Sequence, residues 1–201
     1  MMALDDLYSN FTLLIRWIHI LSGITWLGML FFFNFVNAQV QPRLGEAKSR
    51  VNLELMPRAL WWFRWGAMAT FLAGLTLLVY KYGHQELWMD GAGEMTGRAI
   101  WILIGATLGA IMWFNVWFII WPAQKVLLDW QRNGETPPEQ GILTSRIAFF
   151  SKVNTYLAAP MLFGMIAPNN YGAFSVSSLL IVSAFGFAVI WGLFRISAKV
   201  K

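Results

Sequence analysis

His19 is the residue of this chain that best combines a reactive side chain with an apolar setting. It stands in a long hydrophobic run, with Arg16 three residues before it and Gly23 four residues after it. At helical spacing these three positions share one face. A neutral imidazole can ligate the iron of a haem or the metal of a chlorin, and an arginine pairs well with a carboxylate such as a propionate. The pattern therefore predicts a cofactor site, with His19 as axial ligand, Arg16 on a propionate and Gly23 leaving room for a flat macrocycle.

A purely structural explanation of the same three residues stays open. His19 can hydrogen-bond a neighbouring helix, Gly23 can serve helix packing, and Arg16 can extend to the lipid headgroups. A bis-histidine haem b needs a second imidazole, but the other histidine of the chain, His84, falls in a predicted loop. A five-coordinate haem, ligation by a methionine and a chlorin with one axial ligand are the forms that stay open.

A second group of polar residues lies toward the other end of the apolar runs. It consists of Asn34, Arg64, Asn115 and Asn154. Polar and charged groups inside a bilayer are costly, so they tend to face one another or a functional site. We interpret the four as a buried polar cluster, with a site for a small anion or a quinone headgroup as the alternative. No Asp or Glu falls within the runs, which excludes a carboxylate proton relay there.

Long apolar segments must position these residues. The chain is 58% hydrophobic and 12% charged, whereas soluble domains carry about 25% charged residues. A helix needs about 20 apolar residues to cross the hydrocarbon core, and it satisfies its own backbone hydrogen bonds in lipid. Five segments qualify: 13–36, 60–80, 99–121, 147–167 and 174–196. We expect an all-α integral membrane bundle of five transmembrane helices, forming a single membrane domain over residues 1–201.

The distribution of basic residues predicts the orientation of the bundle. With the N-terminus outside, Arg16, Lys81 and Arg98 are the outside members of the 15 Lys and Arg residues, and the others face the cytoplasm. This bias follows the positive-inside rule, so we expect a cytoplasmic C-terminus and a location in the inner (cytoplasmic) membrane. The net charge of +5 then needs no nucleic-acid partner. Gly105 and Gly109 predict a close helix–helix contact.

Short motifs along most of the chain resemble the membrane domain of the cytochrome-linked urate oxidases, also called urate hydroxylases. The stretches RWIH at 16–19 and GITWLG at 23–28 resemble its first helix, and WFRW at 62–65 with TFLAG at 70–74 resembles its second. GAIM at 109–112, NV at 115–116 and IIWPAQK at 119–125 are similar to a later helix and its loop, and NTYL at 154–157 with PMLF at 160–163 continues the likeness.

This resemblance implies a scaffold in which a larger membrane domain precedes a periplasmic cytochrome c domain. The chain looks shortened, because a pair of the family's helices has no counterpart between its second and third spans. It has no cysteine, and so lacks the Cys-x-x-Cys-His of a cytochrome c. Later helices of the family carry further histidines, and the corresponding positions here are Leu103, Val153 and Gly192. The resemblance therefore supports the fold and weakens the case for haem and for urate oxidation.

Two functions follow as expectations. The first is an accessory or structural subunit of a membrane redox assembly, which contacts the lipid bilayer and either partner membrane helices or a second copy of the chain. The alternative is a haem b-binding electron-transfer component of a urate-oxidising or related oxidoreductase, which passes electrons to a separate cytochrome c. Otherwise no cofactor is expected, and enzyme activity of the chain itself is left open. A transporter is disfavoured, because the chain shows no internal repeat and five spans do not form two equal halves.

Overall fold

Helices make up nearly all of the described chain. The computed structural model describes residues 2–82 and 88–200, and no strand forms within these two ranges. The elements join into five long rods: α1 (Met2–Phe31), a π-helical segment (Phe32–Asn37), α2 (Ala38–Val40) and a 3-10 turn (Gln41–Arg43); α3 (Ala47–Tyr82); α4 (Gly97–Phe114), a second π-helical segment (Asn115–Ile120) and α5 (Trp121–Asn133); α6 (Gln140–Asn170); and α7 (Val176–Lys199). The expected all-α bundle is confirmed.

α6 is less apolar than the other rods. Among the described residues, four helical stretches are long and apolar enough to cross a membrane: Asp6–Arg43, Ala47–Tyr80, Gly97–Asn133 and Val176–Lys199. The fourth expected span lies on α6, which has the length but not the apolarity. Its Asn154 and Thr155 side chains are fully buried. Because these polar groups face the other helices and not lipid, α6 can stand inside a membrane bundle with a less apolar sequence.

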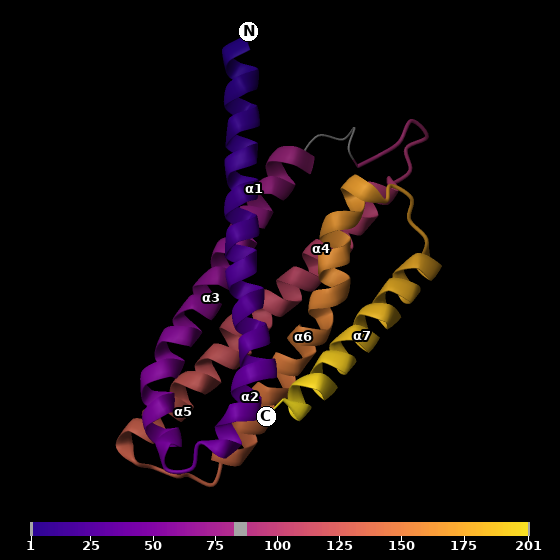
Figure 1. The fold of residues 1–201 in the computed structure, drawn as a ribbon. Coiled ribbons are helices and arrows are strands. Elements are labelled where there is room, and N and C mark those ends of the chain that lie inside the picture. The colour runs from indigo at the N-terminus through magenta and orange to yellow at the C-terminus, as the bar shows by residue number, and fades with distance from the viewer. Residues whose placement is uncertain (1, 83–87, 201) are drawn as a thin grey trace.

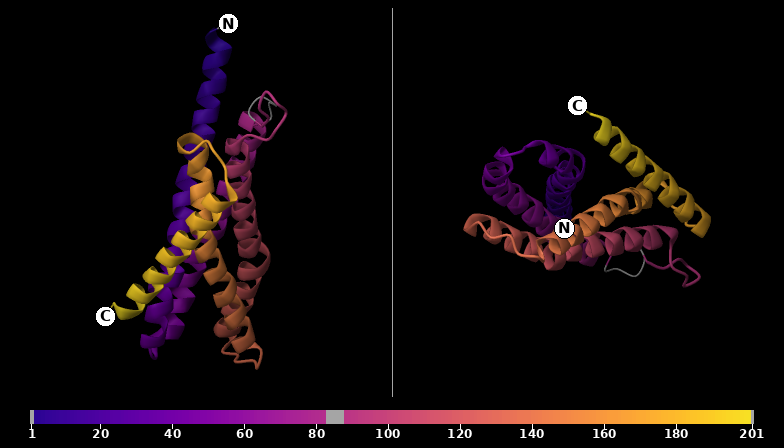
Figure 2. Two further views of the ribbon diagram at one scale, coloured as in Figure 1. Left: turned by 90° about the vertical axis from the view of Figure 1, so that its right-hand side faces the viewer. Right: turned by 90° about the horizontal axis from the view of Figure 1, so that it is seen from below.

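The rods form two groups that meet toward one end of the bundle (Figure 1). α1 packs along α3, whereas α6 packs between α4 and α7. The groups join where the first π-helical segment contacts α6 and α7, and where α3 contacts α5. Figure 2 shows that the N-terminal part of α1 extends beyond the other helices. The opposite end holds α2, α5 and the first turns of α3 and α6, and we call it the basic end because Lys48, Arg50, Lys125 and Arg132 belong to these elements.

Small residues let the backbones of neighbouring helices approach closely. A Cβ atom placed on Gly164 of α6 would lie 2.8 Å from the backbone nitrogen of Gly105 on α4, and one on Gly105 would lie 3.0 Å from the carbonyl carbon of Gly164. Gly105 therefore makes the expected close helix–helix contact, and its partner is Gly164 of α6. A Cβ on Gly109 would meet Met161 at 3.9 Å, which is ordinary packing. The α4–α6 contact thus depends on one glycine from each helix, as membrane helix pairs often do.

Candidate functional site

His19 lies in the contact between α1 and α3. Its Nδ1 atom is 2.8 Å from the backbone carbonyl oxygen of Thr70. A carbonyl oxygen can only accept, so Nδ1 carries the hydrogen and donates it. The neutral ring then keeps a lone pair on Nε2, which no described residue hydrogen-bonds and which is not enclosed. An Nδ1–H bound to a backbone carbonyl is the arrangement that orients histidine ligands in metal sites.

Gly74 of α3, and not Gly23, makes room for this imidazole. A Cβ atom on Gly74 would lie 2.8 Å from Cε1 and 3.1 Å from Nδ1 of His19, so the ring rests directly on the glycine. A Cβ on Gly23 would meet the Thr70 side chain at 3.8 Å, an ordinary contact. No local pattern pairs His19 with a residue more than fifty positions away. The expected place of Gly23 beside a macrocycle stays a prediction.

Arg16 lies one turn from His19 on α1, toward the N-terminal end. Its side chain is exposed, and no described residue forms an ion pair or a hydrogen bond with it. The guanidinium is thus free to meet a carboxylate from outside the chain or to lie among lipid headgroups. Its pairing with a propionate stays a prediction.

Two of the four residues of the expected polar cluster, Asn115 and Asn154, bond to each other, and a third, Asn34, bonds to Ser151 on the same helix as Asn154. Asn34 donates from Nδ2 to Oγ of Ser151 at 2.8 Å. Asn115 donates from Nδ2 to Oδ1 of Asn154 at 2.8 Å. Asn154 in turn donates to the backbone carbonyl of Met112 at 3.0 Å. We call these four side chains, Asn34, Ser151, Asn115 and Asn154, the polar seam, and its satisfied hydrogen bonds favour the structural interpretation over a ligand site.

Both π-helical segments coincide with the polar seam, which the sequence analysis missed. Asn34 lies within the first segment, and Asn115 begins the second. At the second segment the Asn115 backbone N–H is shared between the carbonyls of Ile111 and Met112, and Asn154 donates to the same Met112 carbonyl. A widened helical turn is frequent at functional sites, but no proline marks either position in the sequence. Here each one brings an asparagine against α6.

Arg64 does not join the polar seam. Its Cζ atom lies 3.9 Å from the ring centroid of Trp121 and 5.9 Å from that of Trp65. Its Nε atom is enclosed without a hydrogen-bond partner. The indole nitrogens of Trp26 and Trp113 are the other enclosed donors without a partner among the described residues. Arg64 therefore forms a separate polar feature, surrounded by aromatic rings.

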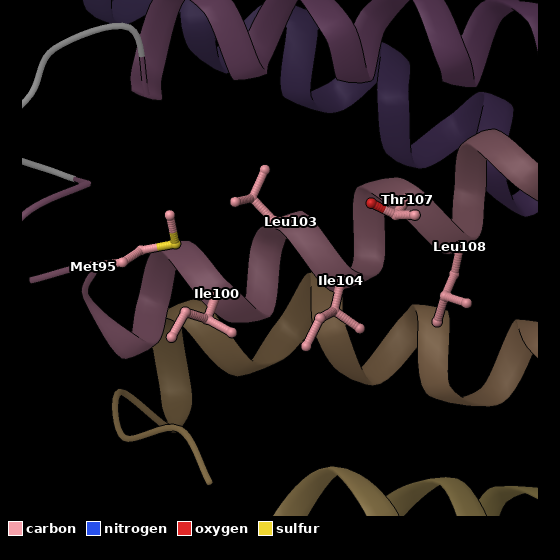
Figure 3. Close-up of a pocket in the computed structure, with 6 residues that line it drawn as sticks. All are labelled: Met95, Ile100, Leu103, Ile104, Thr107 and Leu108. Carbon is pink, nitrogen blue, oxygen red and sulfur yellow. The ribbon is translucent and has the colours of Figure 1, made fainter. Parts of the chain in front are cut away.

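An apolar pocket of about 280 Å³ opens on α4 (Figure 3). Its lining residues are Met95, Ile100, Leu103, Ile104, Thr107 and Leu108. The Thr107 hydroxyl is its one polar side-chain group, and Leu103 occupies a position where the resemblance implies a histidine. The lining side chains of α4 lie along one face of the helix, at the spacing of a helical stripe (Figure 3). Apart from the thioether sulfur of Met95, the lining offers no side chain that commonly ligates a metal.

The donor set fits one axial position of a haem and leaves the second to another source. His19 presents a free Nε2 atom with the hydrogen of Nδ1 already fixed. Within residues 2–82 and 88–200, no group of three or more His, Cys, Asp or Glu side chains could hold a metal ion. His84 lies outside the described residues. A six-coordinate haem at His19 therefore needs a second axial ligand, and ligation by a methionine stays a prediction.

Comparison with known proteins gives one match. Residues 86–197 match the family model described as "Urate oxidase N-terminal". No curated protein and no solved structure matches the chain. The matched region contains α4, α5, α6 and α7 as far as Ser197, and thus Asn115 and Asn154, whereas His19 and Arg64 precede it.

Proposed function

The chain belongs to the urate oxidase N-terminal family, and from this premise we propose that it is a membrane subunit of an oxidoreductase assembly. The family relation supports the redox context, and the helical rods support a place in the bilayer. One observation carries the subunit role. His19 is held with a free Nε2 atom that is not enclosed by the described residues, so a group from a partner protein can reach a redox centre built there.

Co-purification tests the subunit role. The tagged chain is extracted from its native membrane with a mild detergent, and the proteins that remain bound are identified by mass spectrometry. We expect a redox protein to accompany the chain in a fixed ratio. If helix packing alone holds this protein to the chain, a His19→Ala variant should retain it. An unrelated membrane protein with the same tag is the control. Recovery of the chain alone as a monomer would contradict the proposal.

Haem b is the second candidate, because the hydrogen bond to Thr70 leaves Nε2 as the ligating atom. The Thr70 carbonyl would orient the ring and raise its basicity as a ligand, and Gly74 would hold it flat against α3. Arg16, one turn away, would bind a propionate. A bound haem supplies a one-electron carrier. His19, Thr70, Gly74 and Arg16 would bind and orient it. We propose that the chain lies in the inner membrane, with its C-terminus in the cytoplasm.

An absorption spectrum tests this second candidate. Purified chain, reconstituted with haem b, is expected to show a Soret band that shifts or disappears in His19→Ala. His84→Ala is the matched histidine control and should leave the band in place. Pyridine haemochrome analysis gives the haem-to-chain ratio independently of any activity. A Soret band that is equally strong in His19→Ala would assign the haem to another ligand and remove this candidate.

A further inference from the structure

Arg64 is fixed in place by contacts that leave its charge unneutralised. The backbone carbonyl of Arg64 accepts a hydrogen bond from Nε1 of Trp117 at 3.1 Å. The Trp117 ring also packs against Trp65, with ring centroids 5.5 Å apart. The guanidinium itself lies on the face of Trp121, 3.9 Å from the ring centroid. These contacts hold the side chain in one orientation, but an aromatic face attracts a cation without supplying an acceptor for its N–H groups.

No carboxylate of the described chain compensates this charge. The single ion pair within residues 2–82 and 88–200 joins Arg132 to Asp129, and Arg64 forms no hydrogen bond through its side chain there. Glu54 is on the same helix but ten residues away, roughly 15 Å along the axis. A guanidinium offers five donors in a planar fork. The N–H groups that are not enclosed can be satisfied by water or by an anion from outside the chain.

The surroundings of Arg64 indicate a membrane interface. Trp61, Trp62 and Trp65 expose 46%, 57% and 44% of their surface, and exposed tryptophans collect at the level of lipid headgroups. Arg58 lies about 9 Å along α3, toward the basic end of the bundle. Basic residues on that end attract anionic lipids. A phosphate at this level can reach the guanidinium from the side of the lipid.

We propose that Arg64, seated on Trp121 beside Trp65, binds the phosphate of an anionic phospholipid headgroup. The planar fork of the guanidinium donates to two phosphate oxygens, while the two indole rings hold it in the required plane. The inference is independent of any redox role of His19. It assigns to the chain a specific lipid-binding site at the level of the aromatic residues.

Native mass spectrometry of the purified chain in neutral detergent tests the site. The added probes are phosphatidylglycerol, phosphatidylcholine and inorganic phosphate. We expect phosphatidylglycerol to bind most tightly, and Arg64→Gln to weaken it about tenfold, which corresponds to about 1.4 kcal/mol. The matched control is Arg195→Gln, because Arg195 also lies on an indole ring, 4.8 Å from the Trp191 centroid, but at an exposed position. This control should bind phosphatidylglycerol like the wild type.

Several outcomes would overturn the inference. Equal losses in Arg64→Gln and Arg195→Gln would show general attraction by surface charge. Equal binding of phosphatidylcholine would show that a net negative lipid is not required, and competition by inorganic phosphate at the same concentration would assign the site to free phosphate. If Arg64→Gln does not fold, Arg64→Lys decides. A lysine keeps the charge but not the planar fork, so unchanged binding in that variant would refute the proposed geometry.

Discussion

Replacing Asn154 by leucine tests the polar seam most directly. The side chain of Asn154 is fully buried, and the change removes two hydrogen bonds, the 2.8 Å bond from Asn115 and the 3.0 Å bond to the Met112 carbonyl. Side-chain hydrogen bonds between membrane helices contribute about 0.6 kcal/mol on average and about 1.7 at most. Asn154→Leu should therefore lower the free energy of unfolding by about 1–3 kcal/mol. Unfolding with SDS in mixed micelles, followed by circular dichroism, measures it.

A double-mutant cycle separates the hydrogen bond from general packing. In Asn115→Leu/Asn154→Leu neither amide is left without its partner, and replacing both partners of a buried hydrogen bond by apolar groups is often nearly neutral. The double variant should therefore be more stable than the sum of the two single losses predicts. Asn170→Leu, on the exposed end of the same helix, is the control and should change stability by less than about 0.5 kcal/mol. Strictly additive losses, or a loss in Asn170→Leu as large as that in Asn154→Leu, would refute this reasoning.

Three further predictions concern helix contacts, the imidazole and orientation. Gly164→Ala should lower stability by about 1–3 kcal/mol, because the new Cβ meets backbone atoms, whereas Gly109→Ala should be neutral; equal thermal unfolding of the two variants would contradict this. Gly74→Ala should displace the His19 ring, which its Cβ would approach to 2.8 Å, and change the imidazole resonances in NMR spectra of histidine-labelled protein; unaltered resonances would count against the contact. Because the chain has no cysteine, Ser9→Cys in intact cells should react with a membrane-impermeant maleimide and a cysteine at the last position should not, and the reverse pattern would invert the predicted topology.

The sequence predicted the rods well and their mutual contacts poorly. Apolar runs are local features, so the helices could be located from hydropathy and length alone. Gly105 was recognised as a packing residue, but its partner Gly164 was not, because nothing local indicates which helices lie side by side. The apolarity of α6 was overestimated for a similar reason. Its buried Asn154 is tolerated only because other helices cover it.

The sequence was enough to identify the residue types of the candidate site, but not to predict the geometry of that site. His19 was singled out because an imidazole in an apolar run is rare, and the structure adds its bond to Thr70 and its seat on Gly74. Arg64 was grouped with the asparagines because all lie at similar predicted depth. The structure separates them, since depth does not specify the direction in which a side chain points around the helix axis. Arg64 instead contacts Trp121.

A π-helical turn holds about one residue more than an α-helical turn. Beyond Ile120, every side chain is therefore rotated by roughly 100° relative to an uninterrupted α-helix. That rotation places Ala123 and Leu128 of α5 in the buried interior of the basic end. Deleting a single residue from 115–120 would consequently rotate α5 about the helix axis as well as shorten the rod. Ala123 and Leu128 would turn out of the buried interior, while α4, which precedes the deletion, would keep its neighbours.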